Sequence, residues 1–164
     1  MGGGDLLGGG RLGEEASPFA TEPRELTPMR TVMPEPKDID GLISFLPRLY
    51  DDGSPAISKW HGGPGQGGDL GVLPYPEYPE VVKEFFRAAS ADCWSDYQYV
   101  PADAKTTLEK PGFVESADLN QIKTVLTYCV RGERFCVGFW RGMVDDGYIR
   151  RILERLAQLR SQMF

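Results

Sequence analysis

The helical periodicity of residues 116–159 constrains the fold more than any other feature of the sequence. Apolar side chains recur there every three or four residues, which places them on one face of a helix. The pattern predicts three consecutive helices: one capped by Ser116, a second ending at Asp145-Asp146-Gly147, and a third over Tyr148–Ser161. The predicted inward side chains are Leu119, Ile122, Leu126, Cys129 or Val130, then Phe135, Phe139 and Met143, then Ile149, Ile152, Leu153, Leu156 and Leu159.

A charged segment, Arg131-Gly132-Glu133-Arg134, separates the first two predicted helices. Arg131 can donate to the last carbonyls of one helix, and Glu133 can favour the positive end of the next. Arg134 can bind a carboxylate such as Asp145 or Glu115 with both branches of its guanidinium. These roles make a structural corner. The functional alternative is an anion- or partner-binding cluster of Arg131, Arg134 and Arg141.

The preceding residues predict a smaller set of elements. A helix with Ile39, Leu42, Leu46 and Leu49 on one face ends or kinks near Phe45–Leu46, because Pro47 removes a donor. Two short alternating runs, Ala56–Trp60 and Val72–Tyr75, predict a hairpin, and Pro79–Ala89 and Pro101–Glu109 predict two helices. The fold class is α+β: a mostly helical single domain over residues 38–164, with a small two-stranded β-hairpin and a C-terminal three-helix unit.

Residues 1–37 predict a disordered segment. They contain GGG twice and the prolines Pro23, Pro28, Pro34 and Pro36, and they hold too few apolar residues to offset the entropy of ordering. No run of about 18 apolar residues is present, and the N-terminus lacks the pattern of a secretory signal. We therefore expect a soluble, cytoplasmic protein that does not associate with membranes.

Charge argues against nucleic acid as a partner. The net charge is −6 at pH 7, whereas phosphate contacts need a basic surface. One local exception is residues 131–164, which carry 7 basic and 4 acidic residues, and the third predicted helix is expected to offer a basic face of Arg151, Arg155 and Arg160. A weak DNA-binding regulator is kept as a second alternative, and it predicts binding that falls steeply with salt.

The sequence contains no recognisable catalytic or metal-binding set. Its only histidine is His61, and Cys93, Cys129 and Cys136 are too widely spaced for a zinc site or a disulfide framework. The glycine-rich residues 61–71 lack the Lys-Ser or Lys-Thr of a phosphate-binding loop. We predict no catalytic residue, no cofactor and no metal site.

The C-terminal residues resemble a bacterial domain of unknown function, DUF6508. Its members pair "LLT..VRxERF..G" with "M...G.I..IL.RL", and this chain carries Leu126–Phe135 with Gly138, then Met143, Gly147–Ile149 and Ile152–Leu156. The resemblance covers about residues 38–159 and implies no activity. Histidines that often follow the signature glycine and precede the isoleucine are replaced here by Phe139 and Tyr148, which favours a packing or interaction role.

These observations favour a non-enzymatic, protein-interaction or regulatory domain whose partner is another protein. Such a domain should expose an apolar or aromatic patch. The candidates for this patch are Trp60, Tyr75, Tyr78, Trp94, Tyr97 and Trp140. The alternative is a small enzyme or a nucleotide- or anion-binding protein, with a site near Arg131, Glu133 and Arg134 to which the hairpin brings His61.

Overall fold

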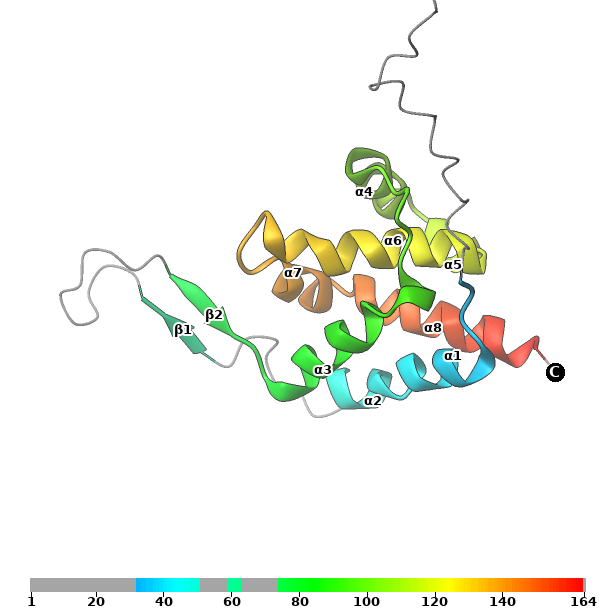
Figure 1. Cartoon of the computed structure of the whole chain (residues 1–164), viewed down its shortest axis with the longest axis horizontal. Coiled ribbons are helices and arrows are strands. Elements are labelled where there is room, and N and C mark those ends of the chain that lie inside the picture. Colours follow the sequence, from blue (N-terminus) through cyan, green and yellow to red (C-terminus); the bar gives the residue numbers. More distant parts are fainter. Residues whose placement is uncertain (1–31, 51–58, 63–73, 164) are drawn as a thin grey trace, which may run out of the picture. The chain divides into compact units, whose positions relative to one another are not determined.

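The computed structural model describes residues 32–50, 59–62 and 74–163, and these form a mostly helical α+β unit (Figure 1). A two-stranded antiparallel sheet is its β component. The elements in order are α1 (Pro36–Ile43), α2 (Phe45–Tyr50), β1 (Lys59–His61), β2 (Tyr75–Glu77), α3 (Glu80–Ala89), the 3-10 turn η1 (Asp92–Trp94), α4 (Pro101–Glu109), α5 (Phe113–Ser116), α6 (Leu119–Arg131), the 3-10 turn η2 (Gly132–Arg134), α7 (Phe139–Asp145) and α8 (Tyr148–Ser161). The predicted fold class is confirmed.

The first helical segment begins earlier and breaks slightly earlier than the sequence predicts. Helix α1 starts at Pro36, which suits a first helical position because its missing N–H needs no partner there. The Asp38 carboxylate accepts a hydrogen bond from the Glu35 N–H at 2.8 Å and so caps the helix. The chain turns at Ser44, and Pro47 falls in the first turn of α2 instead of inside one long helix. The predicted disorder of residues 1–37 otherwise concerns residues 1–31, which lie outside the described part.

The predicted hairpin is present, with its second strand shifted toward the C-terminus. Trp60 is paired with Pro76 and His61 with Tyr75. Residues 56–58 and 72–73 of the predicted strands lie outside the described residues. Strand β2 continues through Pro76 to Glu77, because each strand of a two-stranded sheet has an open edge where a proline costs no ladder bond.

The predicted cap of the first C-terminal helix is wrong by two residues. Ser116 ends the short helix α5, and its hydroxyl donates to the carbonyl of Gly112 at 3.0 Å. Helix α6 is capped by Asp118, whose carboxylate accepts from the Gln121 N–H, while the Gln121 side chain accepts from the Asp118 N–H, each at 2.8 Å. This reciprocal pair satisfies two of the unpaired donors at the helix start.

The second C-terminal helix is shorter than predicted. Helix α7 begins only at Phe139, after Gly138 adopts a left-handed conformation with φ of +85°. Phe135, predicted to point inward, is 82% exposed. Gly147, with φ of +82°, lies between the end of α7 and the start of α8. This left-handed conformation confirms its predicted role as the terminator of the second C-terminal helix.

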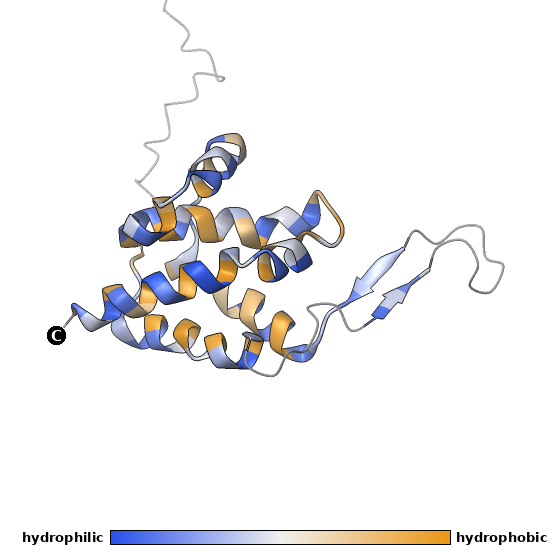
Figure 2. Ribbon diagram, turned by 180° about the vertical axis from the view of Figure 1, so that it is seen from behind, coloured by the Kyte–Doolittle hydropathy of each residue, from blue (hydrophilic) through white to orange (hydrophobic). Residues whose placement is uncertain are grey.

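The core lies around α8, which packs against α1, α2, α5, α6 and α7 (Figure 1). Helix α8 runs between α1 and α6, and its inward face is fully buried. That face comprises Ile149, Ile152, Leu153 and Leu156. Figure 2 shows the same pattern by hydropathy: the helices alternate hydrophobic and hydrophilic segments, whereas the hairpin strands are mostly hydrophilic. The three-helix unit therefore forms the centre on which α1, α2 and α5 pack.

Candidate functional site

Glu133 is the most heavily bonded side chain of the charged segment. Its carboxylate accepts hydrogen bonds at 2.9 Å from the hydroxyl of Tyr78 and from the backbone N–H groups of Gly138 and Trp140. Trp140 occupies the first turn of α7, where N–H groups lack helical partners. Glu133 therefore caps α7 from outside the helix and joins it to the segment before α3.

These bonds fix a turn whose side chains face solvent. We call Phe135–Val137 the apolar turn: Phe135 is 82% exposed and Val137 58%. The Gly132 carbonyl accepts from the N–H groups of residues 135 and 136, each at 3.0 Å, and Glu133 holds the following Gly138. The backbone of the apolar turn is thus bonded at both ends.

The hairpin contributes an aromatic side chain beside this turn. The Trp60 ring lies 3.3 Å from the position that a Cβ would occupy at Gly138, so the absence of a side chain there lets the ring approach. Trp60 is 40% exposed. Trp60 thus lies beside the residue that follows the apolar turn, and we call Trp60 and the apolar turn together the exposed apolar cluster.

Arg134 does not form the predicted ion pair, and among the described residues Arg131 does not donate to the helix-terminal carbonyls predicted for it. The Arg131 guanidinium lies over the rings of Tyr97 and Tyr99, with centroid distances of 5.6 and 5.2 Å. Arg134 is exposed and forms no hydrogen bond or ion pair with a residue in the described ranges. The carboxylates expected for it are occupied by other arginines: Asp145 binds Arg141 at 3.3 Å and Glu115 binds Arg151 at 2.7 Å.

His61 lies on the hairpin and is not among the residues that line the pocket at the charged segment. Its Nε2 lies 2.6 Å from a Glu77 carboxylate oxygen on the opposite strand. The imidazole stacks on the Tyr75 ring at 5.1 Å, and its hydrogen bond lowers the pKa of Glu77. The structure therefore brings Arg131, Glu133 and Arg134 together without His61.

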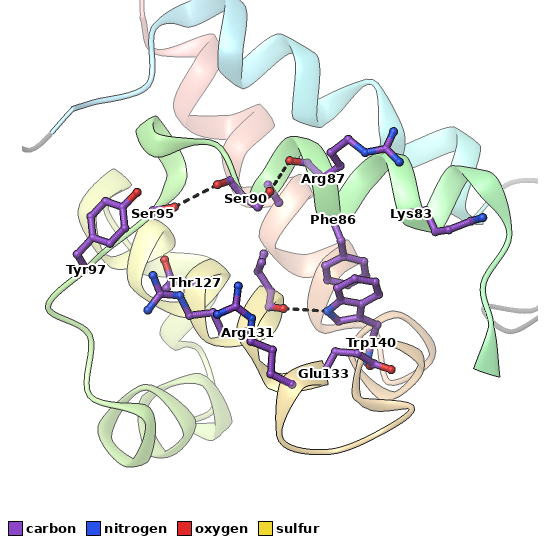
Figure 3. A pocket seen from close by; sticks show the side chains of 13 residues that line it. Lys83, Phe86, Arg87, Ser90, Ser95, Tyr97, Thr127, Arg131, Glu133 and Trp140 are labelled. Carbon is purple, nitrogen blue, oxygen red and sulfur yellow. Dashed lines mark hydrogen bonds between the residues drawn. The ribbon is translucent and has the colours of Figure 1, made fainter. Parts of the chain in front are cut away.

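A pocket of about 720 Å³ opens at the charged segment, between α3, α6 and α7 (Figure 3). One wall carries Lys83 and Arg87 from α3, and the other carries Arg131 and Arg134. Its apolar floor includes Phe86 and Trp140, whose rings stack at 4.3 Å with an angle of 5°. The remaining lining residues are Ala89, Ser90, Ser95, Tyr97, Thr127, Val130 and Glu133.

The neutral polar groups of this pocket are engaged within the chain. Ser90 donates to the Arg87 carbonyl at 2.7 Å, Thr127 to the Lys123 carbonyl at 2.8 Å, and Tyr97 to Asp92 at 2.6 Å. Trp140 Nε1 donates to the Val130 carbonyl at 3.0 Å (Figure 3). The cationic side chains are consequently the main donors left for a ligand.

The basic face predicted on the last helix is also used internally. Arg151 binds Glu115, Arg155 donates to the Ala117 carbonyl at 2.9 Å, and Arg160 binds Asp40 at 2.9 Å. These contacts tie α8 to α5, the α5–α6 junction and α1. They leave fewer free cations on this face than the sequence suggests for a nucleic-acid contact.

The candidate aromatic patch is divided by the fold. Trp60, Tyr75 and Tyr97 are 40 to 51% exposed, whereas Trp94 and Tyr78 are buried. Trp140 is half-buried in the pocket. Tyr78 instead donates to Glu133, and burial raises its pKa above the ordinary value, with the neighbouring carboxylate adding to the effect.

Two kinds of site are not found in the described part of the chain. No group of three or more His, Cys, Asp or Glu side chains there is arranged to hold a metal ion. No helix of residues 32–50 or 74–163 combines the length and the apolar character needed to cross a membrane.

The geometry defines a small, mostly helical α+β domain. In it, the hydrogen bonds of Glu133 fix an exposed apolar turn, and a pocket lined by cationic side chains lies beside that turn. The chain belongs to the family of unknown function DUF6508, whose match covers residues 34–162 and so includes every described helix and strand. No curated protein and no solved structure matches this chain.

Several features of this region have only weak signals in the sequence. Lys83 and Arg87 lie four apart on one face of α3, a spacing that could have indicated a basic stripe. Periodicity alone places Phe135 on the inward face of a helix and gives no signal for the exposed Val137. The partnership of Tyr78 with Glu133 joins residues 55 apart in sequence, and no local pattern reports such a contact.

Proposed function

We propose that this domain is a non-enzymatic protein-interaction module and that it binds another protein through the exposed apolar cluster of Trp60 and the apolar turn. The observation that carries the proposal is Phe135, a large apolar side chain that is 82% exposed on a hydrogen-bonded turn. Large apolar side chains contribute most of the energy in many interfaces when a partner's pocket surrounds them.

The fixed backbone of the apolar turn supports a role in protein binding. Ordering a flexible loop on binding costs free energy, and a turn that is already fixed avoids much of that cost. Glu133 and the Gly132 carbonyl fix both ends of the apolar turn before any partner arrives. The proposal assigns Glu133 a positioning role, and Phe135 and Val137 the contacts.

Photo-crosslinking tests this assignment directly. A benzoylphenylalanine placed at position 135 should crosslink one predominant protein in cells of the source organism. Purified partner should then bind the wild-type domain, and Phe135→Ser should weaken that binding by about tenfold or more. The melting temperature should stay near that of wild type, because Phe135 contributes little to the core.

Val100→Ser provides the matched control, because it removes a different exposed apolar side chain (53% exposed) at the start of α4. It should leave partner affinity unchanged. Equal affinity of the Phe135→Ser and wild-type proteins for the crosslinked partner would contradict the proposal.

A further inference from the structure

The pocket beside the apolar turn has a charge opposite to that of the whole chain. Its walls carry four cationic side chains and one carboxylate, in a protein with a net charge of −6. The single carboxylate is Glu133, whose oxygens already accept from Tyr78, Gly138 and Trp140. These neutral donors stabilise its negative charge, and the pocket presents a positive surface because four cations outnumber this one carboxylate.

The four cations are not all free to the same degree. Lys83 is paired with Glu80 at 3.1 Å on the exposed side of α3, an interaction that is weak in water. Arg87 and Arg134 form no ion pair with any residue of the described ranges. Arg131 is held by aromatic faces, which orient a guanidinium without occupying its N–H donors.

The donors that remain select the kind of ligand. The hydroxyl protons of Ser90, Thr127 and Tyr97 are used internally, so a neutral polyol would find few partners. Guanidinium groups present planar pairs of N–H donors that match carboxylate and phosphate oxygens. The stacked rings of Phe86 and Trp140 add an apolar surface for an organic body.

We propose that this pocket binds a small organic anion carrying at least two negative charges, of the phosphate-ester or polycarboxylate class. The anionic groups bind between Lys83 and Arg87 of α3 and the two arginines of the charged segment, and the organic body lies toward Phe86 and Trp140 (Figure 3). A volume of about 720 Å³ falls within the range of small-molecule sites. This site is separate from the apolar turn, so either proposal can fail alone.

Isothermal titration calorimetry on the full chain tests the class of ligand. The probes are adenosine 5′-monophosphate and citrate, with neutral adenosine as the uncharged comparison. We expect one of the two anions to bind, with an affinity that falls as salt rises from low to physiological concentration. Adenosine should bind at least about tenfold more weakly than the monophosphate.

Charge-removing variants test the location of the site. Arg134→Gln and Arg87→Gln should each weaken the bound anion by about threefold to tenfold, and the double variant by more. Arg150→Gln, which removes an exposed arginine of α8 outside the pocket, should leave the affinity unchanged. Circular dichroism melting should show that all four proteins fold.

Three results would overturn the proposal. They are the absence of binding by both anions at millimolar concentration, equal affinity of wild type and the double variant, and binding of an acidic polypeptide but of neither small anion. The Phe135→Ser variant separates the two proposals, because it should retain anion binding while losing the protein partner.

Discussion

Glu133 shows how one side chain can look functional in a sequence and act structurally in a fold. It lies between two arginines, a setting typical of a catalytic or anion-binding cluster, yet its carboxylate oxygens accept from one phenol and two backbone N–H groups. The sequence identified the residue and offered both interpretations. It could not choose between them, because the deciding partner, Tyr78, comes from a distant segment.

Replacing Glu133 should therefore destabilise the domain. Glu133→Ala leaves the two N–H groups and the Tyr78 hydroxyl without their acceptor, and we expect a loss of about 2 to 4 kcal/mol in the free energy of unfolding. Urea denaturation measures this loss. Glu133→Gln should cost less, because its amide oxygen retains part of the acceptor capacity.

The control for this variant is Glu154→Ala. Glu154 is exposed on α8 and its pair with Arg150 spans 3.8 Å, so its removal should change stability by less than about 0.5 kcal/mol. A Glu133→Ala protein as stable as the Glu154→Ala protein would contradict the structural role.

At the scale of elements, local patterns predicted most of the helices and tertiary contacts set their ends. The periodicities over α3, α4, α6 and α8 correspond to helices in the structure. The sequence contains a signal for the cap at Asp118, since Asp118 and Gln121 have the residue types and the spacing of a capping box, whereas the residue three positions after Ser116 is the apolar Leu119. The late start of α7 was not readable, because it depends on Tyr78, Glu133 and the left-handed Gly138.

Gly132 offers a test of how tightly η2 packs on α7. A Cβ at Gly132 would overlap the ring of Phe139, so Gly132→Ala should destabilise the domain by about 1 to 3 kcal/mol. The matched variant is Gly142→Ala inside α7, where the nearest atom lies 3.8 Å from the added carbon. It should be neutral or stabilise by up to about 1 kcal/mol, because alanine favours helix.

Thermal melting of Gly132→Ala and Gly142→Ala measures the two expected changes in stability. A Gly132→Ala protein that melts at or above the temperature of the Gly142→Ala protein would show that the Phe139 ring moves aside at no cost. In that case the close packing of η2 on α7 would not be a constraint on the sequence.

For the whole molecule, buried phenols predict a loss of stability in alkali. Burial raises the pKa of Tyr50 to about 12 and that of Tyr78 further. Between about pH 10 and pH 12 the unfolded chain therefore releases these protons while the folded chain keeps them. In this range the free energy of unfolding should fall by about 1.4 kcal/mol per pH unit for each tyrosine. Below about pH 10 the ionisation of these two tyrosines should not change it.

Tyr50→Phe isolates one of these two contributions. The variant loses the hydrogen bond from the Tyr50 hydroxyl to the Val144 carbonyl, so it should be less stable than wild type by about 1 kcal/mol at pH 8. That difference should shrink as the pH rises above 10. Urea titrations at several pH values measure it, and a difference that stays constant up to pH 11.5 would contradict the prediction.

The position of α8 in the core has a consequence for synthesis on the ribosome. Helix α8 supplies the surface against which α1, α5 and α7 bury their apolar faces, and its residues are translated after all of theirs. A nascent chain that has not yet released α8 from the exit tunnel lacks this surface, and the burial of Ile39, Leu42 and Val114 seen in the fold is then incomplete. Folding of this domain is thereby coupled to the synthesis of its last helix, and a chain that lacks α8 is the form most prone to aggregate.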